Sequence, residues 1–138
     1  MSHAATILAF DTPGPALVEI TREVADWVDR QGVSTGLLTA MIRHTSASLL
    51  VNENAAPAVR RDLLRWLDRL APQGAQYEHD DEGPDDMPAH LKVALTQTSL
   101  SIPVIEGRPA LGTWQGIFIA EHRARPHRRE VALHLSGD

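Results

Sequence analysis

The sequence predicts a single α+β domain, in which two or three helices pack against mixed or antiparallel sheet layers. Three observations support this class. The 138 residues suit one hydrophobic core. Short segments rich in β-branched and aliphatic residues, separated by Pro and Gly, indicate strands, and longer segments repeat apolar residues at helical spacing. No repeat or low-complexity linker divides the chain, so we expect residues 1–138 to form one domain.

The first elements expected are short strands at residues 7–10 and 16–20, separated by the turn residues Thr12-Pro13-Gly14. A helix should follow over residues 22–30. Thr21 is its candidate N-cap and Gly32 its stop signal.

Two further strands are expected at residues 37–43 and 48–51, on either side of the polar segment His44-Thr45-Ser46. The clearest helix comes next, with Asn54 as candidate cap and Pro57 in the first turn. Its apolar residues recur at helical spacing and predict a core-facing side, formed by Val59, Leu63, Trp66, Leu67 and Leu70.

The second half predicts a short helix from Asp86 to Leu95, with Asp86 as cap and Pro88 in the opening turn. Strands should then resume at residues 100–105, 113–122 and 129–135. The pattern does not determine strand order.

Composition excludes several classes of function. Cysteine is absent, which rules out disulfides, thiolate metal sites and cysteine nucleophiles, so His, Asp, Glu or Asn must hold any metal. The net charge of −5 argues against a nucleic-acid partner. Without a signal-peptide pattern or a membrane-length apolar run, we expect a soluble cytoplasmic protein with no membrane partner.

The segment from Glu78 to Asp86 carries six acidic residues and no basic one, and His79 and His90 lie in and just after it. Such a segment repels itself unless cations neutralise it. Magnesium would bind the carboxylates, whereas zinc would prefer the two imidazoles with at most one carboxylate. The alternative is a solvated acidic loop with incidental histidines.

Four arginines lie between Arg123 and Arg129, and guanidinium groups pair well with phosphate. The segment is therefore either an anion-binding loop or a basic surface loop whose charge balances the acidic segment, within the chain or across a subunit boundary. Gly112 and Gly116 indicate backbone against which another group packs. Gln115 would be a structural bridge or an amide that reads the substrate, and His44 either a hydrogen-bonded strand-end residue or a ligand.

Several short motifs together resemble the YjbQ (UPF0047) family over nearly the whole chain from Gly36 onward. They are His44-Thr-Ser-Ala-Ser-Leu, Val51-Asn-Glu-Asn54, Tyr77-Glu-His-Asp, Glu82-Gly83, Asp85-Asp-Met-Pro-Ala-His-Leu-Lys92, Leu111-Gly-Thr-Trp-Gln-Gly116 and Glu121-His122-Arg123. The resemblance implies a compact α+β fold, a homotrimer and a secondary thiamine-phosphate synthase activity.

Carried over residue by residue, the resemblance implies a central catalytic site formed by His44, Asn54, His90 and Gln115. We expect a small phosphorylated metabolite as partner, contacted by Lys92, Arg123, Gly112 and Thr113. We also expect a divalent ion, zinc or magnesium, with ligands drawn from His44, His79, His90, Glu82 and Asp86. The alternative function is non-catalytic binding of a metal or an anionic metabolite.

Overall fold

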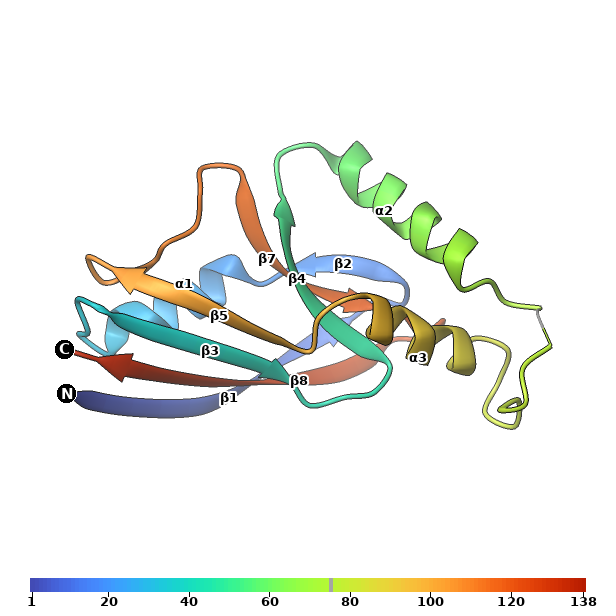
Figure 1. Ribbon diagram of the computed structural model, residues 1–138, viewed down its shortest axis with the longest axis horizontal. Coiled ribbons are helices and arrows are strands. Elements are labelled where there is room, and N and C mark those ends of the chain that lie inside the picture. Colours follow the sequence, from blue (N-terminus) through green and yellow to red (C-terminus); the bar gives the residue numbers. More distant parts are fainter. Residues whose placement is uncertain (75) are drawn as a thin grey trace.

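The computed structural model describes residues 1–74 and 76–138 and confirms the α+β fold class. The elements in chain order are β1 (Ser2–Thr12), β2 (Ala16–Glu19), α1 (Thr21–Arg30), β3 (Gly36–Ile42), β4 (Ala47–Glu53), α2 (Pro57–Leu70), α3 (Asp86–Leu95), β5 (Ser99–Ile105), β6 (Arg108–Pro109), β7 (Gln115–Glu121) and β8 (His127–Gly137) (Figure 1). Every predicted strand and helix is present, with boundaries shifted by up to five residues.

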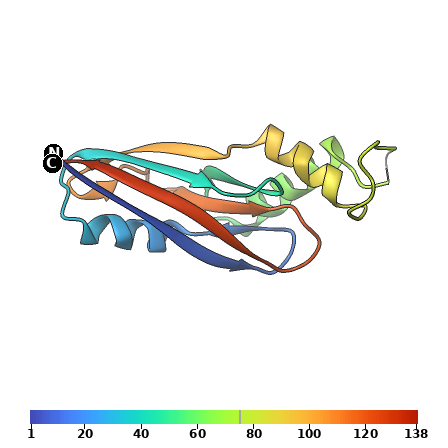
Figure 2. The ribbon, with the colours of Figure 1, turned by 90° about the horizontal axis from the view of Figure 1, so that it is seen from below.

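The strands form two antiparallel sheets, a five-stranded one in the order β1-β8-β3-β5-β6 and a three-stranded one in the order β2-β7-β4. The longest ladder pairs all eleven residues of β1 with β8, which explains why β1 extends beyond the predicted residues 7–10. The main core lies between the two sheets and α1, which buries Val24, Trp27 and Val28. Figure 2 shows α1 along one face of the long strands and α3 beyond their end.

Strand β7 is covered on both faces. Ile117 and Ile119 belong to the main core, whereas Phe118 belongs to a second cluster with Leu17 that packs against α2. Gln115, the first residue of β7, is exposed, so it does not lie on a buried apolar face.

The side-chain caps predicted at Thr21, Asn54 and Asp86 are wrong. The three helices begin after Ile20, Ala56 and Asp85, none of which makes a side-chain capping hydrogen bond. The predicted caps have tertiary partners instead. Thr21 and Asn54 both donate to the Glu19 carboxylate, and Asp86 is buried.

The apolar face of α2 is only partly core. Leu67 is buried, and Leu63 and Leu64 pack on the second cluster. Trp66 and Leu70, however, remain 45% and 49% exposed, which corrects the prediction that the whole face is buried. The reason is that α2 meets the rest of the chain mainly through the small cluster over β7 (Figure 1).

No helix in the described ranges is long and apolar enough to span a membrane.

Candidate functional site

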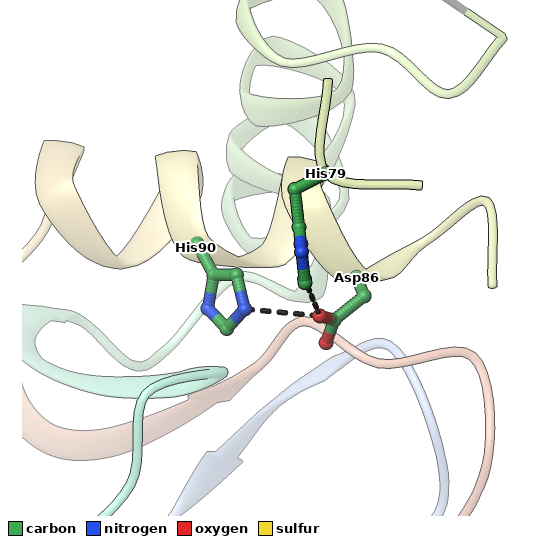
Figure 3. Close-up of side chains that lie close together, drawn as sticks. All are labelled: His79, Asp86 and His90. Atoms are coloured by element: carbon green, nitrogen blue, oxygen red, sulfur yellow. Dashed lines mark hydrogen bonds and ion pairs between the residues drawn. The ribbon is translucent and has the colours of Figure 1, made fainter. Parts of the chain in front are cut away.

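The first turn of α3 and the acidic loop before it bring together two imidazoles and a carboxylate. Asp86 and His90 are four residues apart on the helix and therefore share one face, while His79 approaches from the loop (Figure 3). His79 Nε2 lies 2.8 Å and His90 Nε2 3.0 Å from the same oxygen, Asp86 Oδ2. In the part of the chain that the structure describes, one potential ligand atom from each of these residues lies within 4.8 Å of the others.

The orientation of His90 is set by the loop between β3 and β4. Its Nδ1 lies 2.6 Å from the backbone carbonyl of Thr45. Because a carbonyl oxygen only accepts hydrogen bonds, Nδ1 must carry a proton. The neutral ring then has its lone pair on Nε2, directed at a carboxylate oxygen. That arrangement is repulsive unless a proton or another cation lies between the two atoms.

The electrostatics of the cluster favour an ionised Asp86. Its side chain is only 4% exposed. Burial alone would raise its pKa, but the hydrogen bond from His79 and the nearby charges of His90 and Arg123 together hold the pKa below the usual value. Hydrogen bonding to Asp86, aided by Asp81, raises the pKa of His79.

A solvent-accessible hollow of about 480 Å³ adjoins His79. It is lined by Gly74, Gln76, Tyr77, His79, Asp80, Gly83, Pro84, Met87 and Pro88. A small molecule in this hollow would therefore meet the cluster at His79.

Two of the five predicted metal ligands lie outside the cluster. His44 Nε2 accepts a hydrogen bond from the backbone N–H of Glu130 at 2.7 Å. Burial, followed by the charge of Arg129, lowers the pKa of His44, consistent with a neutral acceptor. Glu82 contributes its backbone carbonyl to Arg123. The His44 segment still adjoins the site, because Thr45 is the residue that orients His90.

Four other predicted site residues, Asn54, Gly112, Thr113 and Gln115, gather at the other end of β4. Asn54 donates to Glu19 at 3.0 Å, and the side chain of Gln115 accepts from the backbone N–H of Gly112 at 2.8 Å, in the turn that contains Thr113. A Cβ on Gly116 would collide with the Glu19 carboxylate, which confirms that this glycine marks a close approach. The seven residues of β4 span about 20 Å, so a single chain does not bring this group together with His90.

The two predicted phosphate-binding cations both have carboxylate partners. Lys92 Nζ donates to Asp68 at 2.6 Å, and the Lys92 side chain is only 10% exposed. Arg123 pairs with Asp85 and Asp86. Arg123 of the basic segment therefore pairs with the acidic segment of the same chain, whereas Arg128 and Arg129 pair with Asp11 and Glu121.

Sequence reasoning missed two buried polar groups behind the site. Ser48 Oγ lies 2.8 Å from His122 Nε2 and 2.6 Å from Thr96 Oγ. Arg129 pairs with the fully buried carboxylate of Glu121 and also binds Ser46, which anchors the loop containing Thr45. The charges of Glu121 and Arg129 were visible in the sequence, but their pairing and burial were not.

The pattern of motifs corresponds to a known family. A family model described as UPF0047 protein YjbQ-like matches residues 6–138. This chain belongs to that YjbQ-like family. It is 50% identical over 133 residues to a UPF0047 protein of Synechocystis, covering 96% of this chain and 90% of the relative. It is 46% identical over 120 residues to YjbQ of Escherichia coli, covering 87% of this chain and 85% of the relative.

Solved structures of YjbQ-like proteins share the fold. A YjbQ/UPF0047-family protein of Clostridium acetobutylicum has a TM-score of 0.88 at 34% identity, covering 95% of this chain and 99% of the other. A conserved protein of Thermus thermophilus has a TM-score of 0.83 at 38% identity, covering 93% of this chain and 97% of the other.

Proposed function

We propose that this YjbQ-like chain binds a divalent, nitrogen-preferring metal ion such as zinc through His79, Asp86 and His90, and that the ion serves catalysis. One observation carries the proposal. The Thr45 carbonyl fixes the proton of His90 on Nδ1, which leaves Nε2 facing Asp86 Oδ2 at 3.0 Å. A backbone carbonyl that orients a histidine in this way is typical of the surroundings of metal ligands.

The ligand types support zinc rather than magnesium. Two imidazoles and one carboxylate form a common ligand set of catalytic zinc sites, which keep a further position open for water or substrate. Magnesium and calcium prefer shells built from oxygen. The hollow beside His79 would give a substrate access to that open position.

The reaction to test first is the one that the family resemblance implies, in which a pyrimidine pyrophosphate and a thiazole phosphate are joined with loss of pyrophosphate. A bound divalent ion would supply a Lewis acid for the departing pyrophosphate. Arg123, which lies beside Asp86, holds the cluster in place rather than a phosphate group. The trimer and the cytoplasmic location stay predictions, and sedimentation at micromolar concentration tests the first.

The alternative is a protein that binds the metal without catalysis, for regulation or storage. The two proposals share the metal site and differ only in turnover, so they can be tested in sequence.

Metal binding is tested first, by calorimetry and elemental analysis on protein stripped with a chelator. Wild type should bind one zinc ion, and His90→Ala should weaken binding about 10-fold or more, because it removes a ligand. His134→Ala is the matched control, since His134 is exposed and lies on β8, outside the cluster. Failure of wild type to bind zinc, nickel, manganese or magnesium would refute the proposal.

Single-turnover measurements with the two thiamine precursors then separate enzyme from binder. Thiamine phosphate formation that requires the metal and is lost in His90→Ala supports catalysis. Zinc binding with no product supports the non-catalytic alternative.

A further inference from the structure

The Arg123 side chain contacts three residues at the end of the acidic loop and the start of α3. Its Nε donates to Asp85 Oδ2 at 2.8 Å, its Nη1 to Asp86 Oδ1 at 2.6 Å and its Nη2 to the backbone carbonyl of Glu82 at 3.1 Å. The side chain is 22% exposed. Asp85 Oδ2 also accepts the backbone N–H of Ala124 at 2.8 Å. The connection between β7 and β8 is thereby fastened to the start of α3.

The contact gives the two carboxylate oxygens of Asp86 different partners. Oδ1 is held by Arg123, whereas Oδ2 faces the Nε2 atoms of His79 and His90. Asp86 therefore offers one oxygen to the centre of the cluster and cannot chelate an ion with both.

The same guanidinium also binds other oxygens of a kind that a hard cation would use. Calcium takes six to eight oxygen ligands, often including a two-oxygen carboxylate and backbone carbonyls. Three oxygens of that kind accept hydrogen bonds from Arg123: the backbone carbonyl of Glu82, Asp85 Oδ2 and Asp86 Oδ1. The positive charge of Arg123 also partly neutralises the carboxylates that would attract a calcium or magnesium ion. It leaves the imidazole ligands His79 and His90 available to a zinc-type ion.

We propose that Arg123 is a positioning residue that determines metal specificity: by occupying Asp86 Oδ1, Asp85 Oδ2 and the backbone carbonyl of Glu82, it selects a zinc-type ion over calcium and magnesium. The inference rests on the metal site proposed above. It assigns to Arg123 a role in choosing the ion, in place of the phosphate contact expected from the sequence.

The test compares Arg123→Gln and Arg123→Lys with wild type, and uses Arg125→Gln as the matched control because Arg125 is an exposed arginine of the same connection. Calorimetry on chelator-stripped protein gives the zinc, magnesium and calcium dissociation constants. Loss of an outer-shell partner typically weakens metal binding about 10–100-fold, so Arg123→Gln should weaken zinc by that factor. The same substitution should also strengthen calcium binding, and so reduce the ratio of zinc affinity to calcium affinity. Arg125→Gln should leave the ratio unchanged.

Arg123→Lys keeps the charge but loses the planar fork, and should give a ratio between those of wild type and Arg123→Gln. The visible spectrum of the cobalt-loaded protein adds a readout of coordination number, which a merely structural role would not change in a folded protein. Arg123→Gln should shift the spectrum toward that of six-coordinate cobalt. If Arg123→Gln does not fold, Asp85→Asn can replace it, because it weakens the ion pair that holds the Arg123 guanidinium and leaves Asp86 unchanged. It should shift the ratio of zinc affinity to calcium affinity in the same direction.

Two failures are distinguishable. Wild type that binds no metal refutes the metal site itself. Wild type that binds zinc, together with a folded Arg123→Gln that keeps the wild-type zinc-to-calcium ratio and cobalt spectrum, overturns the role of Arg123 alone.

Discussion

The buried imidazole of His122 should make the protein less stable as the pH falls from neutral, and His122→Gln should remove that dependence. His122 is only 5% exposed, and its Nε2 lies 2.8 Å from Ser48 Oγ. Thr96 Oγ lies 2.6 Å from the same Ser48 hydroxyl, so the hydrogen-bonding groups next to His122 Nε2 are neutral hydroxyls. Burial, reinforced by the charge of Lys92, lowers the pKa of His122 to about 4.

The magnitude follows from proton linkage. In the unfolded chain His122 titrates near pH 6.5, whereas in the folded protein it stays neutral down to about pH 4. Between these values the unfolded state binds more protons, so the free energy of unfolding falls as the pH falls. The contribution is fully present above pH 6.5. The loss reaches about 2 kcal/mol by pH 5 and about 3 kcal/mol below pH 4.

Urea unfolding of chelator-stripped wild type and His122→Gln, at intervals from pH 7.5 to pH 5, measures this term. Other groups titrate in both proteins and cancel in the difference, while Gln keeps a hydrogen-bonding group near Ser48. Relative to the variant, wild type should lose about 2 kcal/mol over this range. A difference between the two proteins that stays constant with pH would refute the claim that His122 is neutral because it is buried.

The remaining predictions concern three other positions. Arg129→Met leaves the Glu121 carboxylate buried without its cation and should lower the free energy of unfolding by about 3–5 kcal/mol at pH 7. Because the unpaired Glu121 then protonates more easily, this cost should shrink on acidification, and a cost under about 1 kcal/mol in urea unfolding at pH 7 would contradict it. Gly137→Ala places a Cβ against the Thr35 carbonyl and the Gly36 backbone, so it should cost about 1–3 kcal/mol in the same assay, whereas an unchanged midpoint would show that the sheet can yield there. His44→Ala leaves the backbone N–H of Glu130 without its acceptor and should cost about 1–3 kcal/mol. It should also leave the zinc dissociation constant of the folded protein unchanged, and a large loss of zinc affinity would instead place His44 in the metal shell.

Local rules predicted most of the elements and the proximity of Asp86 and His90 in the candidate site. Apolar periodicity located the helices and strands, because each element must bury one face or stripe. The spacing of Asp86 and His90 already placed their side chains together, since residues four apart share a helix face. Gly116 was also informative, because a glycine inside a strand commonly marks a close approach.

Tertiary structure decided which of the remaining polar residues belong together. His44, His79 and His90 are equivalent as residue types, yet only His79 and His90 converge on Asp86, while His44 bonds to the backbone of β8. Thr45 and Asn54 flank opposite ends of strand β4, so motifs close in sequence are separated by the length of an extended strand.

The sequence by itself determined the fold class, the absence of thiolate chemistry and the concentration of acid around two histidines. Only the fold assigned partners, because a hydrogen bond depends on positions within a few tenths of an ångström that residues distant in sequence set jointly. The Thr45 carbonyl that orients His90 is a backbone atom, which no residue type reveals. The guanidinium of Arg123 could pair equally well with a phosphate or with a carboxylate. The packing of the β7–β8 connection against α3 places it beside Asp86.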